Sequence, residues 1–588
     1  MTKFEALGPF AFVPTKGQKA CSVGKSSLVK TACIVFVFCV AAAIASPAQT
    51  LTTLFSFDRG SSINGYSPVG SLVQGVDGNF YGTTAFGGDS GCTEYYETYN
   101  GCGTVFKITP GGTLTTLHSF DGSDGAFPLS GGLVQASDGN FYGTTTSTVF
   151  KITAGGAFAT LHIFDGTDGD QPNALIQGVS GNFYGTAFAG GGLSGCGNVA
   201  EVGCGTVFKI TAEGAFATLH IFDGTDGAYP EAGLVQGTDG NFYGTTSAGG
   251  LSGCGIQAED GCGTIFKITA EGAFATLHIF DETDGYGSLS GLVQGPNGNF
   301  YGTAYYGGVN CDPLGCGTVF KIAPGGTLRT LHTFNDTVGT DPYAGLVGAT
   351  DGNLYGTTTY GGANANGTIF KITPSGTLTT LHSFDGTDGT EVGSLAPVAL
   401  IQATDGNFYG VIGGGGAYGD GTVYRLSTGL GPFVSFLRSL GTVGRTAQIL
   451  GQGFTGTTSV SFNGTPAAFT VESDTYLTAV VPAGASTGVV TVTTPGGTLT
   501  SNKTFRVVPQ IKSFSPTNGP VSTSVVITGE SFIGVIDVHF GNVKVTSFTV
   551  DSDTQITATV PAGAETGKIS VCTSGGSGDS ATSFTVTP

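Results

Sequence analysis

The chain has 588 residues, 103 of them Gly, with a formal net charge of −20 and no Trp. This much Gly without a three-residue period indicates many tight turns between short strands, and no sustained helical periodicity follows the N-terminal segment. So negative a surface repels phosphate backbones and anionic lipids. This excludes nucleic acid as a partner and favours cations or neutral ligands such as glycans.

Residues 1–48 have the pattern of a secretory signal peptide. Lys25 and Lys30 precede an apolar run at 32–45, and small residues follow at 46–48. A basic flank, a short apolar core and small residues at a cleavage point are typical of such a signal. The core is too short to span a bilayer comfortably, so we expect no membrane span after signal removal. The segment before it is long for a signal, so we expect the natural start to lie downstream of Met1.

The main body of the sequence is a tandem repeat. The string Gly-Asn-(Phe/Leu)-Tyr-Gly occurs seven times at spacings of 42 to 61 residues, and each repeat holds four strand-like runs. In one repeat these runs lie at 233–236, 241–246, 263–269 and 273–280. Neither face of the runs is strongly polar, which favours blades packed between blades. We therefore predict a seven-bladed β-propeller over residues 49–428. The run at 51–57 should complete the seventh blade, which ends after its third strand.

Eight cysteines form close pairs within single repeats, and the other three repeats lack both members. This pattern predicts four disulfides, because one thiol alone gains nothing, and it fits an oxidising, extracellular compartment. Zinc is the competing interpretation, but no His accompanies the pairs. Cys572 is left over, and we expect it to be buried. The predicted disulfides are Cys92–Cys102, Cys196–Cys204, Cys254–Cys262 and Cys311–Cys316.

The repeats resemble the GloVer tandem-repeat family of exported bacterial proteins. The resemblance rests on Asp-Gly-Asn-Phe-Tyr-Gly-Thr-Thr (77–84), Gly-Thr-Val-Phe-Lys-Ile-Thr (103–109) and Leu-His-Ser-Phe-Asp-Gly (117–122), and it covers about residues 51–427. It implies export and surface anchoring but no established activity. The absence of Trp argues against kelch and tryptophan–aspartate propellers.

Residues 429–508 and 509–588 are two copies of a second unit, richer in Val, Thr and Ser. Thr-Gly-Glu-Ser-Phe (528–532) and Phe-Ser-Pro-Thr-Asn-Gly-Pro (514–520) resemble IPT/TIG domains. The resemblance implies two immunoglobulin-like β-sandwiches acting as spacers or accessory binding modules. The first copy lacks the Ser-Pro turn at its start.

Two long connections in each repeat should open on the same face, because strands in a blade alternate in direction. One joins the second strand to the third, and the other joins the fourth strand to the next blade. Long loops on a rigid scaffold are where binding usually occurs. The loop of the second repeat is almost absent, leaving a notch. Tyrosines on this face can stack on sugar rings. The candidate ligand-binding residues are Tyr95, Tyr96, Tyr99, Tyr305, Tyr306 and Tyr360.

Paired aspartates recur in the Asp-Gly-Thr-Asp-Gly connections on the same face. They could bind calcium, although the turns also use Asp and Gly for their own geometry. The candidate calcium ligands are Asp121, Asp124, Asp223, Asp226, Asp385 and Asp388. Six His recur at one strand position, where the first run has Phe55. This favours packing over catalysis.

The sequence predicts a non-catalytic, monomeric, secreted or cell-surface protein that binds an extracellular glycan or a surface protein. We expect no cofactor other than the calcium that the paired aspartates could bind. The prediction rests on uniform repeats without a singular polar constellation and without a nucleophile or dinucleotide motif. The alternative is a propeller-type glycan hydrolase or lyase. That enzyme would need two or more buried carboxylates with perturbed pKa values at the channel mouth.

Overall fold

The structure is a computed structural model that describes residues 49–88, 92, 100–129, 132–192, 203–250, 254, 261–308, 315–390 and 400–588. The predicted signal peptide, residues 1–48, lies outside the described residues. The described chain is all-β, and its single helical element is the 3-10 turn η1 (Ser62–Asn64). Within these residues, no helix has the length and apolar character needed to cross a membrane.

Residues 50–427 form seven separate antiparallel sheets, each containing four strands in hydrogen-bonded order. The first strands are β2 (Tyr66–Gln74), β6 (Val134–Gln135), β11 (Ile176–Gln177), β15 (Val235–Gln236), β19 (Val293–Gln294), β23 (Val347–Gly348) and β27 (Ile401–Gln402). The second strands are β3 (Phe80–Phe86), β7 (Phe141–Thr144), β12 (Phe183–Ala189), β16 (Phe242–Thr245), β20 (Phe300–Ala304), β24 (Leu354–Thr358) and β28 (Phe408–Ile412). The third strands are β4 (Thr104–Ile108), β8 (Thr148–Ile152), β13 (Thr206–Ile210), β17 (Thr264–Ile268), β21 (Thr318–Ile322), β25 (Thr368–Ile372) and β29 (Thr422–Ser427). The fourth strands are β5 (Leu114–Ser119), β9 (Phe158–Ile163), β14 (Phe216–Ile221), β18 (Phe274–Ile279), β22 (Leu328–Thr333), β26 (Leu378–Ser383) and β1 (Thr50–Ser56). One sheet has an additional short strand, β10 (Asp170–Pro172), paired with β12.

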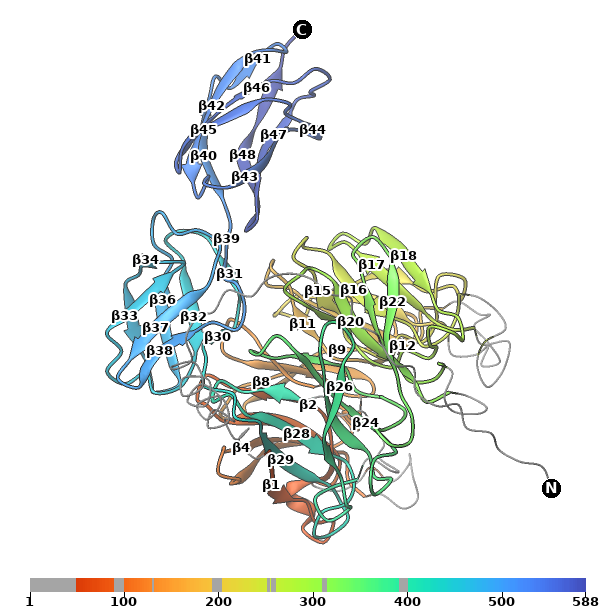
Figure 1. Ribbon diagram of the computed structural model, residues 1–588. Helices are drawn as coiled ribbons and strands as arrows, with labels where there is room; N and C mark the ends of the chain where they lie inside the picture. Colours follow the sequence, from red (N-terminus) through yellow and green to blue (C-terminus); the bar gives the residue numbers. More distant parts are fainter. Residues whose placement is uncertain are drawn as a thin grey trace, which may run out of the picture. The chain divides into compact units, whose positions relative to one another are not determined.

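The N-terminal strand β1 completes the last sheet, as the sequence predicts. It pairs antiparallel with β29, from Thr50 opposite Ser427 to Ser56 opposite Thr422. Figure 1 shows β1 in red beside the green β29. A strand from the start of the chain therefore supplies the fourth place in a sheet otherwise built from residues 401–427.

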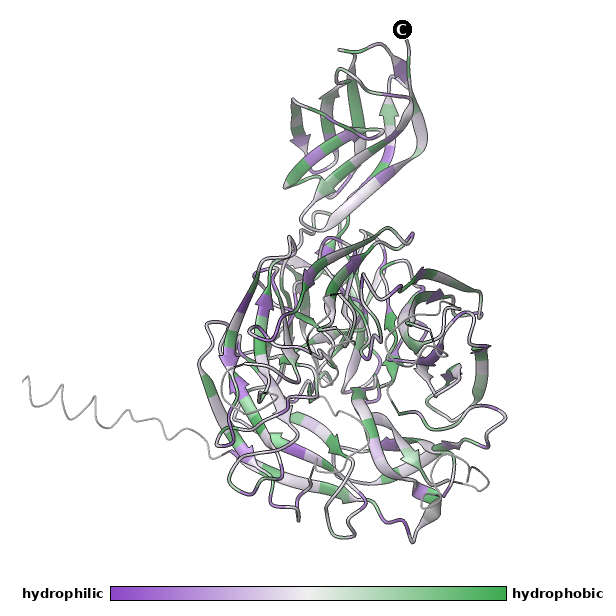
Figure 2. Ribbon diagram, turned by 90° about the vertical axis from the view of Figure 1, so that its right-hand side faces the viewer, coloured by the Kyte–Doolittle hydropathy of each residue, from purple (hydrophilic) through white to green (hydrophobic). Residues whose placement is uncertain are grey.

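The second strands are buried on both faces, which explains their continuous apolar and small-residue sequences. Every described position of β7, β16 and β28 is buried. Apolar positions, green in Figure 2, accordingly recur along the strands. A Gly at the centre of each second strand accommodates a neighbouring ring: a Cβ on Gly244 would lie 2.5 Å from Cζ of Phe266. The recurring Phe-Tyr-Gly string is therefore a packing motif.

Neighbouring sheets contact each other through one recurring aromatic pair. The second-strand Tyr of one sheet packs on the second-strand Phe of the next, as for Tyr81 and Phe141, with centroids 4.0 Å apart. The pair also joins the last sheet to the first, where Tyr409 lies 4.1 Å from Phe80. A first-strand Gln adds a second link in most repeats. Gln74 Oε1, for example, accepts a 2.9 Å hydrogen bond from Thr404 N.

Residues 435–586 form two further pairs of sheets, each pair with its own core. The first pair consists of β30 (Ser435–Phe436), β32 (Thr446–Leu450), β36 (Tyr476–Val480) and β35 (Phe469–Val471) against β34 (Thr465–Pro466), β33 (Ser459–Phe462), β37 (Val490–Thr494) and β38 (Gly497–Thr500), with β31 (Leu440–Gly441) beside β39 (Arg506–Val507). The second pair consists of β40 (Gln510–Ser515), β42 (Ser524–Glu530), β46 (Gln555–Thr559) and β45 (Phe548–Ser552) against β41 (Asn518–Gly519), β48 (Gly576–Val586), β47 (Gly567–Thr573), β43 (Val535–Phe540) and β44 (Val543–Lys544). Cys572 is free and only partly buried, so the expectation of a buried thiol is wrong. It lies opposite Ser577 in the β47–β48 pairing, and the neighbouring Val571 takes the core position.

Candidate functional site

The long connections share one face of the seven sheets, which we call the long-loop face. It comprises the connections between second and third strands and those between each fourth strand and the next sheet. Adjacent strands run antiparallel, so these two kinds of connection leave the sheet at the same end. The second repeat has only three residues between β7 and β8, so this connection is short, as the sequence predicts.

Disulfides hold the bases of the long loops. Cys92 bonds to Cys102 and Cys254 to Cys262, with Cα–Cα separations of 5.2 Å and 5.0 Å. Cys204 and Cys316 are also disulfide-bonded. Their predicted partners, Cys196 and Cys311, lie outside the described residues.

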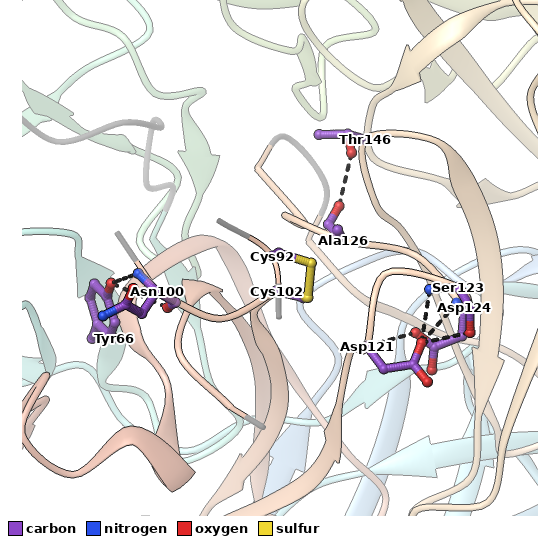
Figure 3. Close-up of a disulfide and its surroundings, with 9 residues drawn as sticks. All are labelled: Tyr66, Cys92, Asn100, Cys102, Asp121, Ser123, Asp124, Ala126 and Thr146. Atoms are coloured by element: carbon purple, nitrogen blue, oxygen red, sulfur yellow. Dashed lines mark hydrogen bonds between the residues drawn. A yellow bond between two sulfur atoms is a disulfide. The ribbon is translucent and has the colours of Figure 1, made fainter. Parts of the chain in front are cut away.

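Figure 3 shows the first disulfide between the Tyr66–Asn100 hydrogen bonds and the turn that holds Asp121 and Asp124. The predicted ligand-binding tyrosines of this loop, Tyr95, Tyr96 and Tyr99, lie outside the described residues.

The paired aspartates are engaged by their own turns. Asp121 Oδ1 accepts hydrogen bonds from Ser123 N at 2.9 Å and Asp124 N at 3.2 Å. Asp124 Oδ1 accepts from Asp121 N at 3.1 Å. The pairs at 223/226 and 385/388 repeat this pattern. Among the described residues, no group of three or more His, Cys, Asp or Glu side chains is placed to hold a metal ion. Calcium binding by these aspartates stays a prediction.

The recurring His pairs with the second Asp of the turn, a contact that the sequence analysis missed. His118 Nε2 lies 2.7 Å from Asp124 Oδ2, and four other repeats have the same pair at 2.6–2.8 Å. His118 also stacks on Phe158 of the next sheet at 3.9 Å. The constant six-residue spacing between His and Asp was the available signal. The paired imidazoles therefore fasten the turn to the strand, and His118, His162 and His220 also contact the next sheet.

One repeat breaks this rule. His332 has Val338 where the others have Asp, and its buried Nε2 makes no hydrogen bond within the described chain. Burial lowers the pKa of His332, which favours the neutral imidazole.

A singular polar cluster lies on the long-loop face, and we call it the tyrosine–carboxylate cluster. It consists of Glu231, Tyr305, Tyr306, Asp341 and Tyr343. Glu231 precedes β15, the adjacent pair 305–306 follows β20, and 341 and 343 precede β23. The Tyr305 ring lies 4.5 Å from that of Tyr306 and 5.4 Å from that of Tyr343, both edge to face. All five residues are partly exposed, so a ligand can reach them.

Tyr286 and Tyr360 border this cluster. The Tyr286 ring stacks on Tyr306 at 5.2 Å. Tyr360 is 38% exposed, and its negative charge on ionisation would raise the pKa values of Tyr305 and Tyr306. The predicted residues Tyr305, Tyr306 and Tyr360 therefore do lie together.

The two carboxylates of the cluster have raised pKa values. Burial raises the pKa of Glu231 to about 7, although hydrogen bonds from Ser247 and Tyr343 favour its ionised form. Burial, together with the negative charge of Asp336, raises the pKa of Asp341 to about 6. Burial and the carboxylate of Glu231 raise the pKa of Tyr343, so its hydroxyl stays a neutral hydrogen-bond donor.

The backbone at two of these connections adopts an unusual conformation. Tyr229 and Asp341 have φ values of 55° and 58°, in the left-handed region that costs about 1–2 kcal/mol for residues other than Gly. Hydrogen bonds hold them there, since their carbonyls accept from Ser247 N at 3.0 Å and Thr359 N at 3.1 Å. The conformation recurs before Pro in several repeats and presents the linker toward the face.

The expectation that the repeats contain no singular polar constellation is therefore wrong. Glu231 and Tyr343 directly follow a linker Pro, where other repeats have Leu129 or Asn173. That difference between aligned linkers was the signal in the sequence. Their proximity to Tyr305 depends on how neighbouring sheets pack.

Comparisons with known proteins find both the repeat and the C-terminal domain. The Gloeobacter/Verrucomicrobia repeat matches residues 43–200, 146–256, 196–396 and 256–477, and the IPT/TIG domain matches residues 509–587. The chain is thus an all-β tandem-repeat protein with a C-terminal IPT/TIG domain. It belongs to the Gloeobacter/Verrucomicrobia repeat family. No curated protein matches it.

Solved structures similar to the chain include a streptogramin B lyase, with 14% identity and a TM-score of 0.43, covering 66% of this chain and 99% of that one. A catalytically inactive virginiamycin B lyase from Staphylococcus aureus has 15% identity and a TM-score of 0.42, covering 64% and 99%. A surface glycan-binding protein from Prevotella bryantii has 20% identity and a TM-score of 0.19, covering 26% and 38%. With identities under 25% and TM-scores below 0.5, these likenesses carry no argument about activity or ligand.

Proposed function

We propose that residues 49–428 form a closed seven-bladed β-propeller and that residues 429–508 and 509–588 are two IPT/TIG sandwiches. The Tyr409–Phe80 contact and the Gln74–Thr404 hydrogen bonds support closure, because they join the last sheet to the first. The separate cores of the two C-terminal sheet pairs support two sandwiches.

We propose that the chain is an exported, non-catalytic protein that binds a glycan on its long-loop face. The observation that carries this is the tyrosine–carboxylate cluster. Tyrosine rings offer flat apolar surfaces for sugar rings, while phenol and carboxylate groups exchange hydrogen bonds with sugar hydroxyls. The disulfides in the long loops fit an extracellular protein. We propose further that the protein is a monomer and that it is secreted or held at the cell surface.

The turns on the opposite face support this choice of face, because residues 429–508 engage several of them. Thr475 Oγ1 donates a 2.9 Å hydrogen bond to Val76 O. Gln452 Nε2 donates a 2.9 Å bond to Thr404 Oγ1. The first sandwich thus acts as an accessory module fixed to the turns of the propeller.

A glycan hydrolase or lyase is the second candidate. It is favoured by two carboxylates with raised pKa values, Glu231 and Asp341, on linkers of different repeats. A protonated and an ionised carboxyl group are the pair that glycoside hydrolysis uses.

The test is a glycan array with the secreted chain, with and without calcium, followed by titration of the best ligand. Tyr305→Ser combined with Tyr343→Ser should weaken binding at least tenfold, since each stacked aromatic contributes about 1–3 kcal/mol in comparable base–aromatic contacts. Tyr418→Ser is the matched control, because Tyr418 is 62% exposed on the same face but outside the cluster. Equal weakening by both would place the ligand elsewhere. Release of reducing ends by the wild type, lost in Glu231→Gln, would replace binding with catalysis.

A further inference from the structure

The tyrosine–carboxylate cluster has no basic partner. The groups that shift the pKa values of Glu231, Asp341 and Tyr343 are carboxylates, hydroxyls and burial, with no Lys or Arg among them. A carboxylate withdrawn from water without a cation costs several kcal/mol when ionised, which is why the pKa rises. The site therefore gains free energy from any cation that enters it.

The whole long-loop face likewise has acidic side chains with almost no basic ones. Across all its connections from residue 57 to residue 421, including the loops outside the described residues, Arg59 is the only basic residue. Arg59 is already paired with Asp420 at 3.2 Å and lies 4.9 Å over the ring of Tyr66. The Lys residues of the repeats instead belong to the third strands. The field at this face thus attracts cations and repels anions.

Two further features of the cluster point to a ligand. Tyr305, Tyr306 and Tyr343 place aromatic rings beside the carboxylates, an arrangement that binds ammonium groups through the ring faces. Thr359 is 8% exposed, and its Oγ1 makes no hydrogen bond within the described chain. It occupies the repeat position of Ser247, whose hydroxyl donates a 2.9 Å hydrogen bond to Tyr229 O and also acts to lower the pKa of Glu231.

We propose that the tyrosine–carboxylate cluster recognises a protonated amine, and that the ligand is a glycan bearing free amino groups. The ammonium group lies against the rings of Tyr305 and Tyr306 and donates hydrogen bonds to the carboxylates of Glu231 and Asp341. The sugar rings extend over the remaining tyrosines. This inference rests on the proposed glycan binding and adds the charge of the ligand.

Proton release provides the decisive signature. The titratable groups around the bound amine are Glu231, Asp341 and Asp336, together with tyrosines that stay neutral. At pH 6 Glu231 is mostly protonated, since its pKa is about 7. A bound ammonium group favours the carboxylate and lowers that pKa, so binding expels a proton from Glu231. Affinity should rise from pH 5 to pH 7 as both carboxyl groups ionise.

The experiment compares chitosan and chitin hexamers, which share a sugar backbone. Chitosan has free amino groups where chitin has N-acetyl groups. We expect the chitosan hexamer to bind the full exported chain about tenfold more tightly at pH 6, from one cation–π contact with a tyrosine ring beside a carboxylate. Calorimetry in buffers of different ionisation enthalpy should show proton release. Glu231→Gln and Asp341→Asn should abolish the preference and the release, while Tyr418→Ser keeps both. Cooperative melting at or above the wild-type temperature shows that the variants fold.

Equal binding of the two hexamers would overturn the inference and leave the proposed glycan binding intact. Failure of both hexamers overturns the inference, and a blank glycan array would then overturn the proposed function as well. If oligolysine binds as tightly as chitosan, the cluster recognises ammonium groups without a sugar, which would overturn the assignment of the ligand as a glycan. If calcium restores glycan binding to Glu231→Gln, the cluster does not need an amine on the ligand, and the proposal of amine recognition would be overturned.

Discussion

The repeat that lacks the His–Asp pair allows a gain-of-stability test. In five repeats an Asp lies 2.6–2.8 Å from the imidazole Nε2, whereas His332 faces Val338 and its Nε2 is buried without a partner. Val338→Asp supplies the carboxylate at the same position of the turn. We expect the variant to be more stable than the wild type at pH 5.5.

The magnitude follows from two opposing terms. A charge-assisted hydrogen bond contributes about 1.5–3 kcal/mol, and it also satisfies a buried nitrogen. Losing the partly buried Val338 side chain costs about 1 kcal/mol. The net gain is on the order of 1 kcal/mol, which raises the melting temperature by roughly 1–2 °C in a unit of this size.

The pH dependence gives the sharper result. In the wild type the pKa of His332 is lowered by burial, so the unfolded chain binds the proton more tightly. Stability is therefore lost as the pH falls below about 6.5. In the variant the new carboxylate favours the imidazolium and raises the pKa of His332. That contribution is fully present below about 6.5 and is lost as the pH rises through the raised value. The advantage of the variant must be larger at pH 5.5 than at pH 8.5.

Differential scanning calorimetry at the two pH values measures this difference. Val338→Asn is the matched control, because it supplies a hydrogen-bond acceptor without a charge and should show less pH dependence. Asp284→Val in the preceding repeat should have the opposite sign, since it breaks an existing pair. A Val338→Asp variant that melts lower than the wild type at pH 5.5, or with the same pH dependence, would refute the reasoning.

Three further predictions follow from other contacts. Deletion of Thr50–Ser56 should lower the melting temperature of the reduced protein by more than 5 °C, because β29 loses its whole antiparallel partner, and an unchanged value would mean that β1 contributes nothing to the sheet. Glu231→Gln should raise the melting temperature at pH 8 by about 2–4 °C and leave it unchanged at pH 4. The pKa of Glu231 rises on folding from its usual 4.5 to about 7, so the wild type loses stability as the pH increases through this range. A variant that is less stable than the wild type at pH 8 would contradict this. Peptide mapping of the exported protein under non-reducing conditions should recover Cys92–Cys102, Cys196–Cys204, Cys254–Cys262 and Cys311–Cys316 as linked pairs, and free thiols or pairs between repeats would count against them.

The repeats determine much of the architecture by themselves. Period-two strands of Phe, Tyr, Val and Ile separated by Gly and Asp turns can bury both faces only against copies of themselves, so the sequence is sufficient to predict seven four-stranded units. The position of the strand-like run at 51–57 can also be predicted, because only the last unit lacks a fourth strand for this run to supply. Cysteine pairs confined to single repeats indicate local bridges. All of these inferences use residues close together in the chain.

The candidate site depends on tertiary structure. Glu231, Tyr305 and Tyr343 belong to connections of three different sheets, and no local pattern links them. They meet because sheet packing, set by pairs such as Tyr243 and Phe300, brings successive connections to one face. Burial in that arrangement, rather than residue type, raises the pKa values of Glu231 and Asp341. The sequence could identify the face and three of its tyrosines, but the carboxylates acquire their properties only where the linkers converge.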